Sequence, residues 1–218
     1  MVGPSGCGKT SLLLTLAGAL PPRTGRLQVT LEGQLGATTC PQGDLPAAQQ
    51  RRPVGLTAED AHVVTTTLRE NLRVANPGAG DDALVAALTR AGLGPWLRSL
   101  PEGLDTRLGS GGTDVSGGER RRLLLARAEV YAAPVRLFDE PGEHLDPRTA
   151  DALVRDILTA GTRSVVVVTH RLAPPAAADA VIVLDGGVAA ARGSHDELLA
   201  TDEAYRLTLQ SQNARVRT

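Results

Sequence analysis

The sequence has no uninterrupted apolar run close to the roughly 18 residues that a membrane-spanning helix requires, so it predicts no such helix. It also has no excess of charge of one sign. Its 23 basic and 24 acidic side chains leave a net charge of −1, which gives no electrostatic case for binding nucleic acid. Aromatic residues form only 2% of the chain, so the core must be built from Leu, Val and Ala. The two cysteines, Cys7 and Cys40, lack metal-ligand spacing and indicate a reducing cytosol.

Lysine is nearly absent as well, and the one that is present marks a motif. Lys9 lies in Gly3-Pro4-Ser5-Gly6-Cys7-Gly8-Lys9-Thr10, which fits the phosphate-binding loop G-x-x-x-x-G-K-[ST]. An arginine could not easily replace this lysine, because the side chain must place a compact ammonium group between phosphate oxygens, where a planar guanidinium group does not fit. The motif predicts that the chain binds a nucleoside triphosphate. The expected phosphate-binding residues are Gly3, Pro4, Ser5, Gly6, Cys7, Gly8, Lys9, Thr10 and Ser11.

The position of this loop in the sequence is unusual, because only Met1 and Val2 precede it. A phosphate-binding loop normally joins a buried strand to a helix whose N-terminus points at the phosphates. Two residues are too few to supply that strand. We therefore expect the sequence to be the C-terminal part of a longer protein, or the product of a gene whose start was misassigned.

Strands alternate with helices along the rest of the chain, which predicts an α/β fold with a mostly parallel sheet interrupted by a helical insertion. Residues 33–53 are rich in Gly, Pro and Gln and are expected to be irregular. Strands are predicted at residues 27–31, 135–139, 164–169, 180–184 and 188–192. Helices are predicted at residues 11–20, 68–74, 81–91, around 96, at 119–131, and from Asp146 and Ser194 onward.

Three further elements could carry chemistry. Ser116-Gly117-Gly118 opens a helix with backbone N–H groups free to meet an anion, although for this motif in isolation an ordinary N-cap is the favoured interpretation. Asp139 and Glu140 end an apolar strand, where Asp suits a Mg²⁺ shell and Glu can activate water; an acidic loop is the plainer reading. His170 follows four valines and is expected at the C-terminal edge of the sheet, where ligands bind, although a lone His at such a place is more often structural.

In this order and spacing, the four elements resemble the ATP-binding cassette family, with its Walker A loop, signature motif, Walker B strand and switch histidine. Asp146 matches the aspartate of the family's D-loop. The resemblance implies a P-loop NTPase (RecA-like) core over residues 1–218. It also implies an inserted helical subdomain at about 68–131 and an antiparallel β-subdomain that is largely missing.

The resemblance further implies roles for individual residues. ATP and Mg²⁺ would bind the Walker A loop, with Thr10 and Asp139 holding the metal. Glu140 would be the general base, and His170 would contact the γ-phosphate. Two cassettes would pair head to tail, so that Ser116, Gly117, Gly118 and Asp146 complete the ATP site of the partner.

Several segments are similar to one subgroup, the CydC-type subunits of thiol reductant exporters in their actinobacterial form. The matching segments include Thr67-Leu68-Arg69-Glu70-Asn71-Leu72 and Gly193-Ser194-His195-Asp196-Glu197-Leu198. This resemblance implies a CydD-type partner and export of cysteine or glutathione for cytochrome bd assembly. The transmembrane domain would lie in a missing N-terminal region or a separate chain, and this chain would lie at the cytoplasmic face of the plasma membrane. The alternatives are a soluble cassette ATPase of another process and a degenerate cassette that binds ATP without hydrolysing it.

Glu59 and Arg136 depart from the family pattern, and a run of three arginines is interpreted separately. Glu59 is expected at the position where a Gln usually contacts Mg²⁺ and the attacking water. Gln42 is a rival candidate for this position, but it lies too far upstream of the segment Thr67-Leu68-Arg69-Glu70-Asn71. Arg136 interrupts the Walker B strand and should reach a carboxylate or solvent, because a buried unpaired Arg is costly. Arg120-Arg121-Arg122 is expected to be a solvated helix face near the subunit interface.

The carboxylate of Glu59 would bring negative charge towards the γ-phosphate, so we expect this site to turn over slowly. Glu59→Gln should change the ATPase rate of the complete complex. A rate that stays the same would exclude Glu59 from the site.

Overall fold

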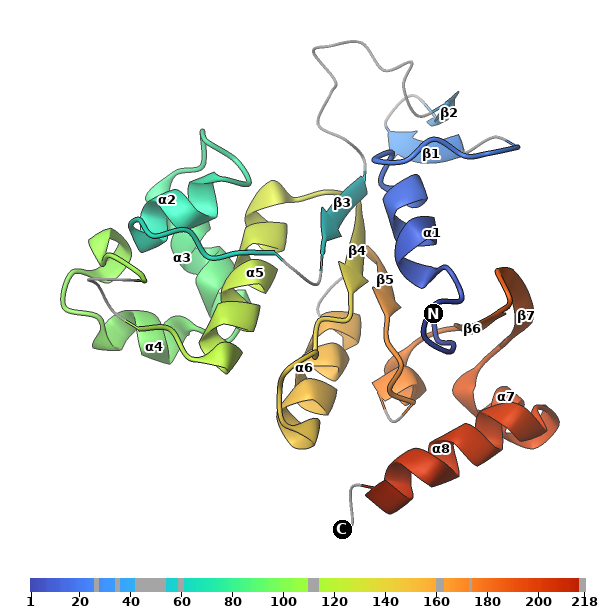
Figure 1. Cartoon of the computed structure of the whole chain (residues 1–218). Coiled ribbons are helices and arrows are strands. Elements are labelled where there is room, and N and C mark those ends of the chain that lie inside the picture. The colour runs from blue at the N-terminus through green and yellow to red at the C-terminus, as the bar shows by residue number, and fades with distance from the viewer. Residues whose placement is uncertain are drawn as a thin grey trace.

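A computed structural model describes residues 1–25, 28–33, 36–41, 54–58, 61–109, 114–159, 163–172 and 174–215. A central sheet lies between α1 and α6, and a group of helices, α2 to α5, packs to one side of it (Figure 1). The strands are β1 (Gln28–Gly33), β2 (Gly36–Pro41), β3 (Val54–Thr57), β4 (Val135–Asp139), β5 (Ser164–Val168), β6 (Val181–Asp185) and β7 (Val188–Gly193). The helices are α1 (Lys9–Leu16), α2 (Leu68–Arg73), α3 (Asp81–Arg90), α4 (Gly94–Ser99), η2 (Gly103–Asp105), α5 (Gly117–Tyr131), α6 (Pro147–Thr159), η3 (Pro174–Ala177), α7 (His195–Thr201) and α8 (Glu203–Arg215).

The strands β3, β4 and β5 form a parallel sheet in that order, and β6 and β7 form an antiparallel hairpin. The first two residues connect these two sheets. The Met1 carbonyl accepts from Thr169 N at 3.1 Å, while Val2 N donates to Ile182 O at 2.9 Å and Val2 O accepts from Leu184 N at 2.8 Å. Residues 1–8, all of which the structure describes, form no strand before α1, as the sequence predicted, but Val2 forms an isolated parallel bridge with Val183, so the first two residues still pair with both neighbouring sheets.

The two faces of the parallel sheet are covered by different helices, because side chains alternate along a strand. On one face, Leu137 of β4 packs with Leu13 and Ala17 at α1. On the other face, Phe138 packs against Leu153 and Ile157 of α6. This alternation also puts Asp139 on the face of Leu137, which is the face that carries α1 and the loop before it.

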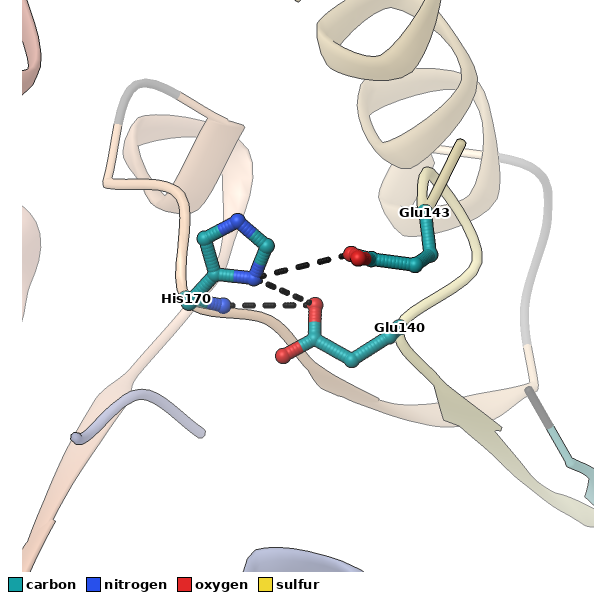
Figure 2. A group of neighbouring side chains, drawn as sticks. All are labelled: Glu140, Glu143 and His170. Atoms are coloured by element: carbon teal, nitrogen blue, oxygen red, sulfur yellow. Dashed lines mark hydrogen bonds and ion pairs between the residues drawn. The ribbon is translucent and has the colours of Figure 1, made fainter. Parts of the chain in front are cut away.

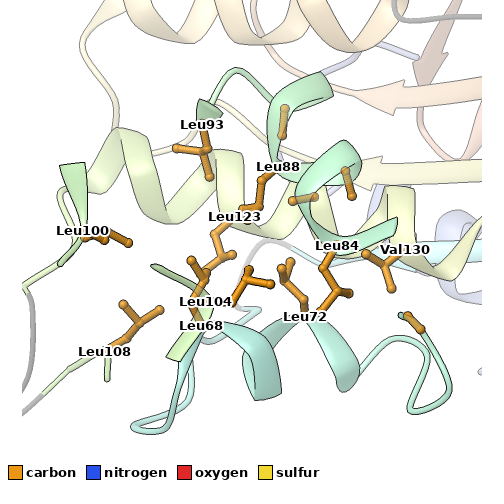
Figure 3. Close-up of a cluster of buried hydrophobic side chains, with 14 residues drawn as sticks. Leu68, Leu72, Leu84, Leu88, Leu93, Leu100, Leu104, Leu108, Leu123 and Val130 are labelled. Carbon is orange, nitrogen blue, oxygen red and sulfur yellow. The ribbon is translucent and has the colours of Figure 1, made fainter. Parts of the chain in front are cut away.

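The helices α2 to α5 enclose a hydrophobic cluster of their own (Figure 3). Leucines at helical spacing supply most of it, and no aromatic side chain is among its fully buried members. The sequence prediction of a core made of Leu, Val and Ala is confirmed here. The largest members are Leu68, Leu72, Leu84, Leu88, Leu93, Leu100, Leu104, Leu108 and Leu123.

The segment Thr67–Leu72 organises this helical group through polar contacts. Thr67 caps α2 by accepting from Glu70 N at 3.1 Å. Asn71 is fully buried and binds the Val64 backbone through both its amide oxygen and its nitrogen. Arg69 pairs with Asp105 at 2.9 Å and with Asp81, which ties α2 to η2 and α3. The motif is thus explained by the internal architecture of the helical group.

The structure differs from the sequence predictions in several elements, among them β2, β3 and α1. β2 lies within residues 33–53, which were expected to be irregular, and it pairs with β1 as one antiparallel hairpin. β3 was not predicted at all. α1 spans Lys9–Leu16 rather than residues 11–20, because its N-cap, Gly8, adopts a left-handed conformation directly before Lys9. By contrast, the bounds of Val135–Asp139 agree with the prediction.

Arg136 reaches a carboxylate, as the sequence predicted. Its guanidinium forms an ion pair with Glu129 of α5, and both side chains are largely buried. Glu129 also pairs at 3.0 Å with Arg90 of α3, whose side chain is half exposed. The pair therefore joins the helical group to the central strand β4 through a contact that is shielded from solvent.

Removing one partner of a buried ion pair leaves a charge without compensation, which costs about 3–5 kcal/mol. We expect Glu129→Ala to lower the free energy of unfolding by an amount in that range, as measured by urea titration. Arg90→Ala is the matched control and should cost less than about 1 kcal/mol, because Arg90 is the exposed member. Equal losses in the two variants would contradict the importance of the buried pair.

Candidate functional site

The candidate site lies at the C-terminal edge of the parallel sheet, beside the N-terminus of α1. A cavity of about 350 Å³ opens there. A cavity of about 540 Å³ lies beside β5 and β6, so size alone does not select the site. What distinguishes the smaller cavity is a lysine facing three carboxylates and a histidine. Its lining residues are Ser5, Gly6, Gly8, Lys9, Thr10, Ser11, Asp139, Glu140, Glu143 and His170.

The loop before α1 owes its shape to glycines. Gly6 and Gly8 have φ angles of 79° and 94°, in the left-handed region that side chains rarely adopt. Gly3 is required for a different reason, because a Cβ there would lie 2.2 Å from the carbonyl oxygen of Leu184. Cys7 is buried under the loop and forms part of its packing. The loop thereby turns its backbone towards the cavity and leads directly into the first turn of α1.

Lys9 is held across the mouth of this loop. Its ammonium donates to the carbonyls of Gly3 at 2.9 Å and Pro4 at 2.8 Å, and the residue is only 9% exposed. These two contacts keep the charge of Lys9 at the cavity wall. A ligand that offers anionic oxygens could replace the carbonyls without requiring the side chain to move far.

Asp139 presents an unsatisfied buried oxygen at the same cavity. The residue is 5% exposed, and its Oδ1 has no hydrogen-bond partner among the described residues. A buried carboxylate oxygen without a partner is costly, which makes it a natural ligand for a cation. Thr10 lines the same cavity and offers a hydroxyl, so hard oxygen ligands of the type that Mg²⁺ prefers are present.

Glu140 and His170 contact each other at the edge of the sheet (Figure 2). The His170 ring Nδ1 lies 3.1 Å from Glu140 Oε2, and the His170 backbone N donates to the same oxygen at 3.3 Å. Glu140 has a φ angle of 42°, unusual for a residue with a side chain. Burial raises the pKa of the Glu140 carboxyl, and the nearby His170 ring offsets part of that rise.

Glu143 is a residue of this site that the sequence analysis missed. Its carboxylate lies 3.9 Å from His170 Nδ1, and Figure 2 shows it converging on the same ring. The sequence feature that could have identified it is the Pro141-Gly142 pair, because such a dipeptide favours a turn, and this turn brings Glu140 and Glu143 together. The backbone confirms the turn, since Glu143 N donates to Glu140 O at 2.9 Å.

Ser116, Gly117 and Gly118 do not line this cavity in the described part of the chain. Ser116 is the N-cap of α5 and forms a capping box with Glu119. Asp146 caps α6 by accepting from Thr149 N at 3.1 Å, and its bonds with Thr149 hold the pKa of Asp146 below its ordinary value. Ser116 and Asp146 therefore both act as ordinary helix N-caps. Any additional role in binding would require a ligand that lies outside this cavity.

The expectation of a solvated arginine face on α5 is wrong for two of its three residues. Arg121 donates to the Glu143 carbonyl at 3.2 Å. Arg122 donates to the Ala91 carbonyl at 3.2 Å and pairs with Asp156 at 3.4 Å. These side chains therefore bind neighbouring segments.

Glu59 and Gln42, the two candidates for a further ligand, lie outside the described residues.

Comparison with known proteins decides the family. A family model described as ABC transporter matches residues 1–143. This chain belongs to the ABC transporter family. The ATP-binding domains of ABC exporters are ATPases, so the enzyme class expected from the sequence is confirmed at the level of the family.

Relatives with different printed functions are similarly close to this ABC chain. It is 37% identical over 207 residues to the glutathione/L-cysteine transport system ATP-binding/permease protein CydC of Escherichia coli (strain K12), covering 94% of this chain and 34% of that protein. It is 39% identical over 201 residues to the mycobactin import ATP-binding/permease protein IrtB of Mycobacterium tuberculosis (strain ATCC 25618 / H37Rv), covering 91% and 33%.

The solved structure of a bacterial Atm1-family ABC exporter with ATP bound superposes with a TM-score of 0.80 at 30% identity. The match covers 97% of this chain and 36% of that one, which supports the predicted cassette fold. The chain thus spans about a third of the length of these relatives. Within its described residues, no helix has the length and apolar character needed to cross a membrane.

The raised pKa of Glu140 predicts a stability cost at neutral pH. Well below the ordinary pKa of Glu, the carboxyl is protonated in both the folded and unfolded chain, and Glu140→Gln should change little. As pH rises through the pKa of the folded state, the parent must bury a charge that Gln lacks, so the parent loses stability. We expect the melting temperature of Glu140→Gln to exceed that of the parent by more at pH 7 to 8 than at pH 4.

Thermal unfolding without nucleotide measures this difference. Glu102→Gln, at an exposed turn, is the matched control and should show no stabilisation. A Glu140→Gln protein that melts below the parent at neutral pH would contradict the cost assigned to the buried carboxylate.

Proposed function

We propose that this chain is the ATP-binding and ATP-hydrolysing domain of an ABC exporter subunit, and that its own cavity binds the phosphates of ATP. One observation carries the proposal most strongly. Lys9, the unpaired Asp139 oxygen and the Glu140–His170 pair all border one cavity, although they come from three separate parts of the sequence. Phosphoryl transfer needs this combination of a cation, a metal ligand and a base.

In the proposed mechanism, residues Gly3 to Ser11 surround the phosphates, and Lys9 exchanges the Gly3 and Pro4 carbonyls for phosphate oxygens. Thr10 and Asp139 would hold Mg²⁺, which neutralises phosphate charge when it is bound. Glu59 remains a third proposed metal ligand on sequence grounds alone. The cavity has three carboxylates against one ammonium, so a bound cation would be needed to offset repulsion of the anionic nucleotide.

Glu140 is proposed as the general base that accepts a proton from the water attacking the γ-phosphorus. A carboxyl whose pKa is raised by burial is a stronger base than an ordinary one, which suits this role. His170, bonded to Glu140 through Nδ1, is proposed to contact the γ-phosphate and to orient the carboxylate. ADP and phosphate would then leave from the same cavity.

Ser116, Gly117, Gly118 and Asp146 are proposed to act on the ATP of a second cassette. They are absent from the lining of their own cavity, and the first turn of α5 has backbone N–H groups at Gly117 and Gly118 that the capping box does not use. This supports a head-to-tail dimer in which residues about 68–131 form the inserted helical subdomain of a domain spanning 1–218.

We further propose that the subunit is of the CydC type, pairs with a CydD-type subunit, and exports cysteine or glutathione for cytochrome bd assembly. The transmembrane domain would lie in another part of the protein or in a second chain, and this domain would lie at the cytoplasmic face. The support is the likeness to CydC and the subgroup segments, while IrtB and Atm1-family relatives are comparably similar. Thiol uptake into inverted vesicles that contain the complex distinguishes the CydC-type assignment from these two.

Glu140→Gln should lower ATP hydrolysis by about 100-fold or more, because general-base catalysis contributes at least that much, while ATP binding persists. Phosphate release and retention of labelled ATP measure the two effects in the complete complex. His144→Asn is the matched control, since His144 is exposed, neighbours Glu143 and has a left-handed backbone that Asn tolerates. Undiminished hydrolysis by Glu140→Gln would refute the assignment of the base.

A further inference from the structure

The three side chains in Figure 2 have the arrangement of an unassigned metal site. One oxygen each from Glu140 and Glu143 and the Nδ1 atom of His170 all lie within 4.8 Å of one another. Ligands bound about 2.0–2.2 Å from a tetrahedral ion lie about 3.3–3.6 Å apart. The separations of 3.1 Å and 3.9 Å from His170 Nδ1 to the two carboxylates bracket that range. A small movement of the Glu143 side chain towards His170 would bring its carboxylate oxygen to that separation as well.

The backbone holds these ligands in place before any ion binds. Glu140 and Glu143 are joined by the turn whose Glu143 N–H donates to Glu140 O at 2.9 Å. The Arg121 guanidinium binds the Glu143 carbonyl at 3.2 Å and fixes the turn against α5. His170 directly follows β5, and its own N–H donates to Glu140 at 3.3 Å. Preorganisation of this kind lowers the entropy cost of binding a metal.

The chemistry of the ligands selects a class of ion. An imidazole with two carboxylates suits Zn²⁺ and its neighbours among the first-row divalent metals, whereas Mg²⁺ prefers oxygen ligands alone and retains its waters. Two carboxylates and a neutral ring would balance a divalent charge. More than half of the His170 side chain is exposed, which gives an ion direct access from solvent.

We propose that Glu140, Glu143 and His170 bind one Zn²⁺ ion, and that this ion inhibits ATP hydrolysis. The site is separate from the proposed Mg²⁺ ligands Thr10 and Asp139, but it shares the cavity with them. Bound zinc coordinates one oxygen of Glu140, and its positive charge lowers the basicity of the whole carboxylate, so Glu140 no longer accepts a proton from the attacking water. Zinc also holds the His170 ring through Nδ1, which fixes the ring away from the orientation that the γ-phosphate requires. Zinc binding itself is independent of the proposed function, and only the inhibition rests on it.

Binding is tested on the full chain without nucleotide, using zinc alone in competition with a chromophoric chelator and with millimolar Mg²⁺ present. We expect one zinc per chain. Glu143→Gln and His170→Gln should each weaken binding about tenfold or more, while His144→Asn, next to the cluster, should bind as the parent does. Retention of zinc by His170→Gln would place the ion elsewhere, for example on Cys7, and would overturn the proposal. A loss in His144→Asn as large as in His170→Gln would overturn it as well.

Inhibition is tested by adding zinc to the complete complex during ATP hydrolysis. The parent and His144→Asn should lose activity at the zinc concentrations that fill the site, and Glu143→Gln should require about tenfold more. Full occupancy with undiminished hydrolysis would overturn the inhibitory role. Zinc binding by a complex that hydrolyses no ATP would instead refute the proposed function and leave the metal site standing, so the two failures are distinguishable.

Discussion

The candidate site depends on the register between β4 and β5. In their parallel pairing, Asp139 lies opposite Val168, so both strands end at the same edge of the sheet. The ladder continues for one further bond, from Glu140 N to Val168 O at 3.0 Å, before the backbone of Glu140 turns away. Glu140 and His170 emerge beside each other as a result. A shift of one residue would turn these side chains to opposite faces.

The polar groups of the site are arranged for a ligand more than for stability of the empty chain. Lys9 binds carbonyls of its own loop, one oxygen of Asp139 has no described partner, and Glu140 is a buried carboxyl with a raised pKa. The unpartnered Asp139 oxygen and the buried Glu140 carboxyl are local costs that surrounding packing must offset. The hydrophobic contacts of α1 and α6 with the sheet supply that support on both faces. The Arg136–Glu129 pair connects the same strand to the helical group.

Strong local signals made much of the fold predictable from sequence. The four valines and the apolar run before Asp139 predicted β5 and β4, and the fixed positions of the phosphate loop predicted Lys9 at the site. β3 escaped notice because its sequence, Val-Gly-Leu-Thr, is only four residues long and contains a glycine, which is unfavourable inside a strand; it becomes a strand by pairing with β4. The same reasoning applies to Met1 and Val2, whose backbone bonds to two neighbouring strands arise only in the folded chain. Glu143 was missed because its place at the site depends on a turn and on His170. His170 lies 27 residues further along the sequence and is brought close by the pairing of β4 with β5.

The central claim is that the cavity at the edge of the sheet holds the phosphates of ATP. A crystal structure of the Glu140→Gln protein with Mg²⁺ and ATP tests it most directly. The account predicts phosphate oxygens within hydrogen-bonding distance of Lys9, a metal beside Thr10 and Asp139, and the γ-phosphate close to His170. Nucleotide bound at another cavity, or phosphates that leave Lys9 on the carbonyls of Gly3 and Pro4, would contradict it.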